Sequence, residues 1–235
     1  MLLNVDKTNY ILFRRISTKY NDEYNLSINN TILERKRSVV LLGLHLDEFL
    51  NWDTHFKHVK NKLISANYVL SKLKHSLSKH HLKMIYHAIF QSHINYGCML
   101  WFNTKKSNLN YISKLQMKAV KHINHGKTTT LAKENLLSVN DLNKLSLLNF
   151  MHRISSNSIS ENIKCLFTLN NEVHSYSTRQ ANAPHIPKYN YQQTINSFIH
   201  QAPMNWITLP HELKTLAPST FKRRIKKYLS NNRYI

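Results

Sequence analysis

The chain has 235 residues, 42% of them hydrophobic, and carries 33 Lys+Arg against 12 Asp+Glu, for a formal net charge of +21. This composition can bury one or two modest cores, which excludes a generally disordered chain. A one-signed charge excess of this size points to a polyanionic partner, and nucleic acid is the first expectation.

The first 50 residues are typical of short strands. β-prone runs cover residues 10–13, 24–28 and 31–33, and Asn29-Asn30 can take the positive φ of a tight hairpin turn between the last two. The stretch SVVLLGLHL, residues 38–46, predicts a further strand pair. Gly43 lies inside this stretch, where a glycine usually marks a bulge or the close approach of another backbone.

From Trp52 the apolar residues recur at helical spacing, with Asn51 placed to cap the first helix. The same period predicts a second helix capped by Ser78 and three more over about 107–123, 141–156 and 219–230. We therefore expect an α+β protein that is mostly α, with a small N-terminal antiparallel β element followed by a helical bundle. All five prolines follow residue 180, which suggests a boundary near 170–185.

The predicted helix over 107–123 carries the clearest binding signal. Lys114, Lys118, Lys121 and His125 share one face, and the opposite side holds Ile112, Leu115, Ala119 and Ile123. A cationic stripe of this kind can contact a phosphate backbone, or it can be the solvated face of an ordinary core helix. Both interpretations stay open, and the same holds for FKRRIKKYL in the last helix.

No catalytic constellation is recognisable. Two-metal phosphoryl transfer needs several converging carboxylates, and the only adjacent acidic pairs are Asp22-Glu23 and Asp47-Glu48. We interpret the first as a solvated turn and the second as support for the start of the helix at Trp52. Three histidine spacings resemble zinc motifs, but no cysteine pair or His-Glu-x-x-His accompanies them. They are His55-x-x-His58, His122-x-x-His125 and His87-x5-His93.

The two cysteines, Cys98 and Cys165, lie outside any C-x-x-C, so neither a disulfide framework nor a cysteine zinc site is indicated. A reducing setting is the default, and we expect an intracellular protein of the cytoplasm and nucleus. No stretch approaches the roughly 18 uninterrupted apolar residues of a spanning helix, so no membrane partner is expected.

Five segments in a fixed order resemble the C-terminal third of reverse transcriptases from LINE-type (non-LTR, jockey-like) retrotransposons. They are LNVDKTNYILF, LSINNTILERKRSVVLLGLHLDEFLNW..H, SHINYGCMLW, HSYSTR and APMNWITLPHELK....STFKRRIKKYL. The resemblance runs over essentially the whole chain. It implies a palm remnant and primer-grip hairpin over 1–50, a helical thumb-like bundle over 51–170, and a C-terminal segment with a basic helix over 171–235.

The resemblance also implies roles for particular residues. Lys7 is similar to a palm lysine near the triphosphate of the incoming nucleotide, where it can help protonate the leaving group. Leu42, Gly43 and Leu44 resemble the tip of the primer grip, which presses the primer 3′ end toward the catalytic metals. The thumb clamps the RNA/DNA hybrid. The basic residues expected to contact nucleic acid are Lys57, Lys72, Lys114, Lys118, Lys121, His125, Lys222, Arg223 and Lys226.

The match departs from the family at the catalytic aspartates. In the family, a Tyr/Phe-x-Asp-Asp motif precedes the lysine segment, and here Met1-Leu2-Leu3 stands in mid-palm. We therefore expect no cofactor in this chain and Mg²⁺ only in a complete polymerase. The expected partners are RNA, RNA/DNA hybrid, a DNA target and the N-terminal palm and fingers. A non-catalytic RNA-binding or protein-interaction scaffold from a truncated retroelement is the alternative.

Overall fold

The computed structural model describes residues 4, 8–17, 25–173, 176 and 181–231. It is mostly helical with a few short strands near the N-terminus, which confirms the expected α+β class. The chain forms two compact units, Met1–Asn61 and Lys62–Ile235, which we call the first and second units. The three-part division expected from the sequence stays a prediction.

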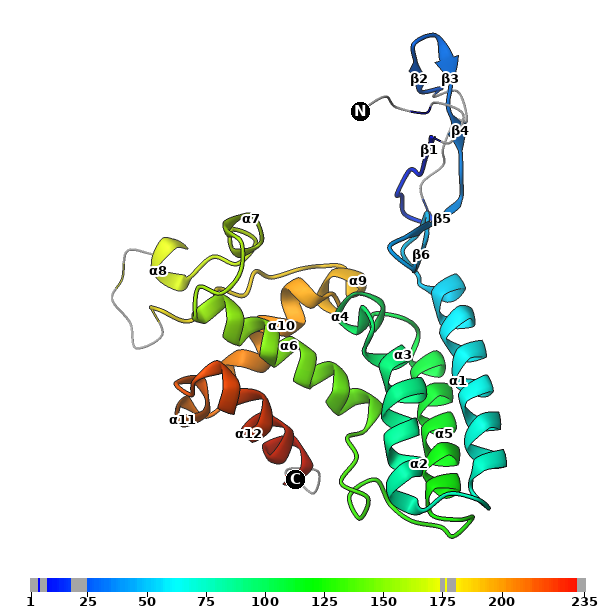
Figure 1. Cartoon of the computed structure of the whole chain (residues 1–235). Helices are drawn as coiled ribbons and strands as arrows, with labels where there is room; N and C mark the ends of the chain where they lie inside the picture. Colours follow the sequence, from blue (N-terminus) through cyan, green and yellow to red (C-terminus); the bar gives the residue numbers. More distant parts are fainter. Residues whose placement is uncertain (1–3, 5–7, 18–24, 174–175, 177–180, 232–235) are drawn as a thin grey trace. The chain divides into compact units, whose positions relative to one another are not determined.

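The described strands of the first unit form three two-stranded ladders, and their labels can be followed in Figure 1. β2 (Ser27–Ile28) and β3 (Thr31–Ile32) are antiparallel around Asn29-Asn30, whose φ angles of 50° and 60° confirm the expected turn. β1 (Asn9–Tyr10) pairs with β4 (Glu34–Arg35) in parallel. The expectation of a purely antiparallel element was therefore wrong for this pair.

The third ladder is the hairpin of β5 (Ser38–Leu41) and β6 (Leu44–Asp47). Leu41 pairs with Leu44, so the loop is only Leu42-Gly43, with φ angles of 48° and 78°. Two consecutive positive φ values define a type I′ turn, which suits the right-handed twist of the flanking strands. Gly43 therefore occupies the turn, and its interpretation as a bulge within a strand was wrong.

A carboxylate joins the hairpin to the helix that follows. One Asp47 oxygen accepts the N–H groups of Phe49 and Asn51, both at 3.1 Å, and the other accepts that of Trp52 at 3.0 Å. The side-chain oxygen of Asn51 accepts the N–H of Asp53 at 2.9 Å, at the start of α1 (Asp53–Leu73). The N–H groups of Trp52 and Asp53 lie at the start of the helix, where such donors have no partner within the helix. Asp47 therefore supports the helix start through its bond to Trp52.

In the second unit, the end of α1 lies beside α5 (Lys106–Ile123), and Asn67 donates to the carbonyl of Leu115 at 3.1 Å (Figure 1). α2 (Lys79–Ile85), the π-helical segment η2 (Tyr86–Gln91) and α3 (Ser92–Asn95) run on as one helical stretch. Its fully buried side chains recur every four residues: Leu82, Tyr86, Phe90 and Ile94. On a regular α-helix, each residue is rotated about the helix axis by roughly 40° relative to the residue four positions earlier. The wider π turn offsets this rotation and keeps the four side chains on one face.

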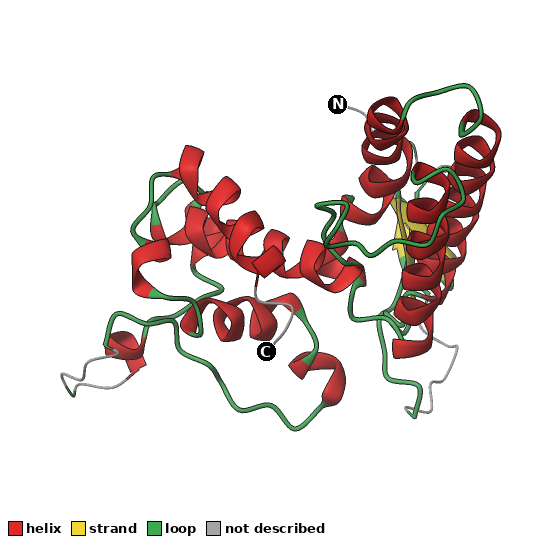
Figure 2. Ribbon diagram, turned by 90° about the horizontal axis from the view of Figure 1, so that it is seen from below, coloured by secondary structure: helices red, strands yellow, loops and turns green. Residues whose placement is uncertain are grey.

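The C-terminal half is built around α6 (Val139–Ser155), which begins at a capping box of Ser138 and Asp141. α6 packs against α10 (Phe198–Ile207) and α12 (Pro218–Asn231), which lie beside it in Figure 1. Figure 2, coloured by secondary structure, shows that helices make up most of the described fold. Among the described residues, the periodicity predicted neither α10 nor the five single-turn helices that complete the unit. They are α4 (Cys98–Trp101), α7 (Glu161–Lys164), α8 (Asn170–Val173), α9 (Gln192–Ile195) and α11 (His211–Lys214).

Candidate nucleic-acid interface

The cationic face of α5 is exposed along its length. Lys114, Lys118 and Lys121 are all solvent-accessible, whereas Ile112 and Ala119 are fully buried on the opposite side. The helix period alone produces this division, because residues three and four apart share a face. The three lysines therefore form one surface. His125, expected on the same face, lies beyond the helix end at Ile123, and Leu115, expected on the buried side, is only half-buried.

The end of α5 brings in a fourth lysine. His125 and Gly126 leave the helix with φ angles of 51° and 87°, a left-handed ending typical of helix C-termini. This ending aims the His125 ring at the loop after α1, where Nδ1 lies 2.8 Å from the carbonyl oxygen of Lys74. Lys74 is thereby held near Lys118 and Lys121, although more than 40 residues separate it from them in the sequence.

The imidazole of His122 lies among these lysines. Burial lowers its pKa, and the positive charges of Lys74, Lys118 and Lys121 lower it further. Among the described residues, neither ring nitrogen of His122 has a hydrogen-bond partner. We define the phosphate-site candidate as Lys74, Lys114, Lys118, Lys121 and His122. Its concentrated positive charge is what an anion would offset.

The phosphate-site candidate also has a purely structural explanation. Lys121 and His122 lie in the last turn of α5, where a cation stabilises the exposed carbonyl groups of the helix. Stabilising the helix end does not require three lysines around one half-buried imidazole, because each additional positive charge repels the others. The additional positive charge therefore favours an anionic ligand over a solvated helix end.

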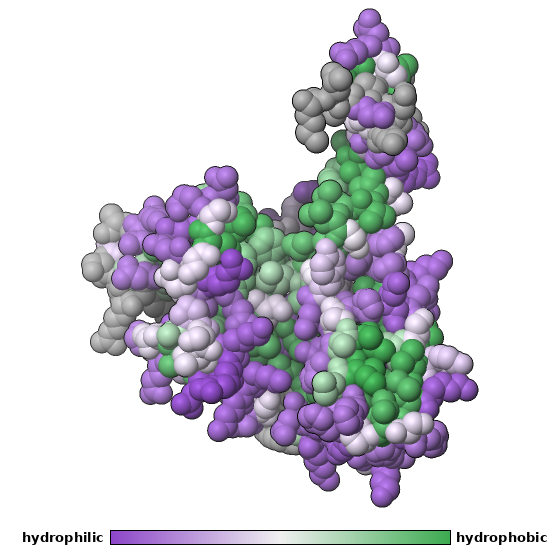
Figure 3. Space-filling model, in the orientation of Figure 1, coloured by the Kyte–Doolittle hydropathy of each residue, from purple (hydrophilic) through white to green (hydrophobic). Residues whose placement is uncertain are grey.

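The remaining predicted contacts lie elsewhere. Lys222, Arg223 and Lys226 are exposed on α12, whose buried side holds Phe221, Ile225 and Leu229. Lys226 lies close to His87. Burial lowers the pKa of His87, and the charges of Lys226 and Lys83 lower it further, whereas the hydrogen bond that His87 donates to Gln91 Oε1 raises it. Hydrophilic side chains cover much of the visible face in Figure 3. The α12 cations therefore form a second basic surface.

Lys72 and Lys57 complete the predicted set. Lys72 is exposed in the last turn of α1, with Nζ 5.5 Å from the centre of the Tyr68 ring. Lys57 is exposed and belongs to the first unit, whereas the residues of the phosphate-site candidate belong to the second. Lys7 lies outside the described residues.

The hairpin residues that resemble a primer grip form an apolar tip. Val40, Leu41 and Leu42 are 62%, 58% and 83% exposed, so three neighbouring large apolar side chains face solvent. Leu44 is half-buried on the returning strand. An exposed apolar tip of this kind is typical of a contact surface rather than of a core hairpin.

The acidic residues near the hairpin have structural partners. Beside the Asp47 bonds described above, Glu48 is buried and its Oε2 lies 2.9 Å from Arg14 Nε and 3.2 Å from Arg35 Nη2. Glu48 thus ties the strands together and, unlike Asp47, does not support the helix start. Within the described ranges, no three His, Cys, Asp or Glu side chains are arranged to hold a metal ion.

The histidines whose spacings resemble zinc motifs lie in different environments. His45, His55 and His58 cluster in the first unit, with the His45 and His58 rings 4.6 Å apart. Burial, with smaller effects of His45 and His58, lowers the pKa of His55 to about 4. His93 lies on a different element from this cluster, in α3.

Among the described residues, no helix combines the length and apolar character needed to cross a membrane. The sequence matches no family model, and no curated protein or solved structure matches the chain either.

Proposed function

We propose that this chain is the nucleic-acid-binding C-terminal portion of a non-LTR retrotransposon reverse transcriptase, which grips the primer and the RNA/DNA hybrid. The phosphate-site candidate carries the proposal, because three exposed lysines and the half-buried Lys74 concentrate positive charge around His122, which suits a polyanion. The order of the five sequence segments supports it independently, and so does the net charge of +21.

The geometry of α5 suits a nucleic-acid backbone. Lys114 and Lys121 are seven residues apart, which is roughly 10 Å along the helix axis at 1.5 Å per residue. One nucleic-acid strand advances roughly 3.4 Å per nucleotide, so the stripe can follow neighbouring phosphates of one strand. Contacts of this kind position a duplex without reading its sequence.

The hairpin supports the same proposal. By resemblance its tip presses on the primer end, and the Asp47 bonds make the connection between β6 and α1 stiff. In a primer grip, such a joint would keep the tip and the root of the helix at a constant separation. The exposed apolar side chains of Leu41 and Leu42 suit contact with the flat faces and sugars of a primer terminus.

The test is a salt titration of RNA/DNA hybrid binding by the full chain, followed by fluorescence anisotropy. The variant changes Lys114, Lys118 and Lys121 to Gln. We expect weaker binding and a salt dependence that flattens by about 0.7 to 0.9 log units per lost phosphate contact. Preference among hybrid sequences should hardly change, because phosphate contacts carry no base information.

The matched control changes three other exposed lysines of the second unit to Gln: Lys106, Lys144 and Lys188. Both triple variants lose the same net charge, so only local contacts distinguish them. Equal salt slopes in the two variants would show that the α5 stripe is a solvated face and that binding follows total charge alone.

A further inference from the structure

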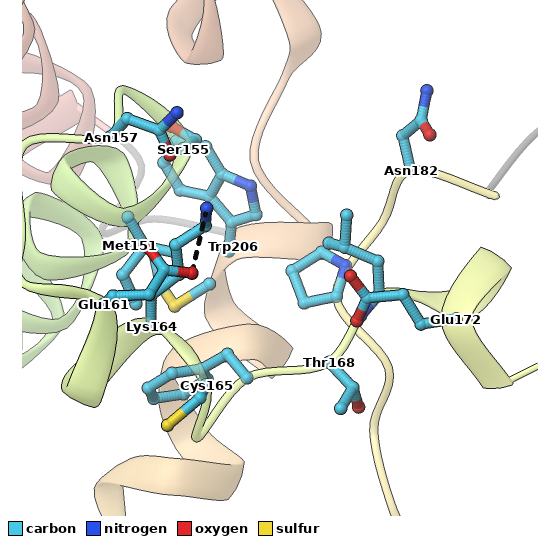
Figure 4. A pocket seen from close by; sticks show the side chains of 14 residues that line it. Met151, Ser155, Asn157, Glu161, Lys164, Cys165, Thr168, Glu172, Asn182 and Trp206 are labelled. Carbon is cyan, nitrogen blue, oxygen red and sulfur yellow. Dashed lines mark hydrogen bonds and ion pairs between the residues drawn. The ribbon is translucent and has the colours of Figure 1, made fainter.

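A pocket of about 630 Å³ opens between the end of α6, α7, α8 and α10 (Figure 4). Its floor is apolar, with buried side chains from α6, α10 and the segment after α7: Met151, Phe167 and Trp206. Pro184 closes one wall. A volume between roughly 300 and 1,000 Å³ with an apolar floor and a few polar groups is the usual form of a small-molecule site.

Among the described residues, the charged side chains that line the pocket are two carboxylates, Glu161 and Glu172, and one lysine, Lys164. In this part of the chain, acidic side chains outnumber basic ones at the rim, in contrast to the sequence as a whole. Glu161 and Lys164 lie on one side, beside Met151 and Trp206, and Glu172 lies on the other (Figure 4). A phosphate ligand suits this rim poorly.

The two carboxylates differ in how firmly local contacts hold them. Oε2 of Glu172 accepts the N–H of Leu169 at 2.9 Å, which orients the carboxylate at the start of α8. Oε1 of Glu161 lies 3.6 Å from Lys164 Nζ, in an ion pair whose glutamate is largely exposed. An exposed pair of this length contributes little by itself, so Glu161 can exchange it for a cation in the pocket.

We propose that this pocket binds an amphipathic amine, a flat apolar group that carries one cationic nitrogen. The apolar group lies against Met151, Phe167 and Trp206, and the nitrogen lies at the rim between Glu161 and Glu172. The site is separate from the phosphate-site candidate, and it does not depend on the function proposed above.

A cysteine that lines the pocket can report whether the pocket is occupied. Cys165 is exposed and lines the pocket, and its thiol donates to the carbonyl of Asn162 at 3.1 Å. The other cysteine, Cys98, is buried, and burial raises the pKa of its thiol, so it reacts slowly with alkylating reagents. The rate of alkylation by iodoacetamide therefore reports whether the pocket is occupied.

The experiment measures Cys165 alkylation by mass spectrometry in the full chain, with three probes that share one ring system. 2-Naphthylmethylamine is cationic, 2-naphthalenemethanol is neutral and 2-naphthoate is anionic. We expect the amine to protect Cys165 at a concentration up to roughly fivefold below that of the alcohol, as exposed charge pairs give. The naphthoate should protect least, even though it is attracted to the rest of a +21 surface.

Two variants test the charge assignment. Changing Glu161 and Glu172 to Gln together should remove the preference for the amine while leaving protection by the alcohol unchanged, because Gln still accepts the Leu169 N–H. Glu212→Gln, an exposed carboxylate on α11, should change nothing. Equal protection by all three probes, or no protection by the amine, would overturn the proposal.

Discussion

Leu42 has a backbone conformation that leucine seldom adopts. Its φ of 48° lies in the left-handed region, where a Cβ atom costs roughly 1 to 2 kcal/mol. Type I′ turns favour asparagine or aspartate at this position, and the leucine side chain recovers little by burial because it is 83% exposed. Leucine at this position is unfavourable for local stability and is also exposed. This combination indicates that its side chain serves a contact with another molecule.

Replacing this residue should therefore stabilise the hairpin. In Leu42→Asn the turn gains a residue suited to positive φ, and we expect the β5–β6 amides to exchange about fivefold more slowly, equivalent to about 1 kcal/mol. The measurement is hydrogen exchange of the peptide covering residues 38–47. Leu41→Asn is the control, since Leu41 lies in β5 and outside the turn. Faster exchange in Leu42→Asn would show that the leucine side chain stabilises the turn.

At the scale of elements, one buried carboxylate connects α2 to the loop that precedes α6. Glu134 is only 3% exposed, with Oε1 2.7 Å from Lys79 Nζ and Oε2 2.9 Å from Lys83 Nζ. Lys83 also donates to the main-chain carbonyl of Glu134 at 3.0 Å. Burial alone would raise the pKa of Glu134, but the two lysines hold it below the usual value of 4.5.

This pair makes stability depend on pH in a definite direction. Because the folded-state pKa of Glu134 is depressed, its contribution is fully present above about pH 4.5 and is lost as the pH falls through the folded-state value. We expect Glu134→Gln to lower the free energy of unfolding by about 2 kcal/mol at pH 7, typical of a lost charge-assisted bond. The difference from the wild type should shrink below pH 4.5.

Urea unfolding followed by circular dichroism at pH 7 and pH 4 measures both effects. Glu161→Gln is the control, because its exposed pair with Lys164 should be worth less than about 1 kcal/mol. A Glu134→Gln deficit that stayed constant across this pH range would mean that the carboxylate is not the ionised partner of Lys79 and Lys83.

At the scale of the whole molecule, several of the described acidic side chains already have partners within the fold. Asp47 accepts three backbone N–H groups, Glu48 is paired with two arginines, and Glu134 with two lysines. A carboxylate that already stabilises the fold is poorly placed to hold a catalytic cation. The large positive charge remains available for polyanions over the rest of the surface.

We therefore expect the purified chain to bind RNA/DNA hybrid at low salt without extending a primer. Nucleotidyl transfer by two metal ions needs carboxylates that hold Mg²⁺ against the triphosphate and the primer hydroxyl. Binding should weaken steeply as salt rises, since counterion release supplies most of the affinity. The measurement is Mg²⁺-dependent extension of a DNA primer on an RNA template, beside a filter-binding titration. Extension that EDTA abolishes would mean that Asp47 and Asp53 belong to an active site.

Local patterns determined much of this molecule. Apolar periodicity predicted the long helices, and Asn29-Asn30 predicted its turn, because both depend on neighbours within a few residues. The exposure of Lys114, Lys118 and Lys121 followed from the same period. Short helices such as α7 and α11 have too few residues for a period to show, so the sequence did not indicate them.

Contacts between segments that are distant in the sequence could be identified only from the tertiary structure. Lys74 reaches the end of α5 only because the His125 ring meets its carbonyl, and Gln116 is buried because its amide donates to Tyr86 at 2.9 Å and to the Leu137 carbonyl at 2.8 Å. The pocket proposed to bind an amine is likewise lined by Glu161 and Glu172, which come from separate helices. A sequence specifies local spacing directly, but which polar groups satisfy one another across the core is decided only when the helices pack.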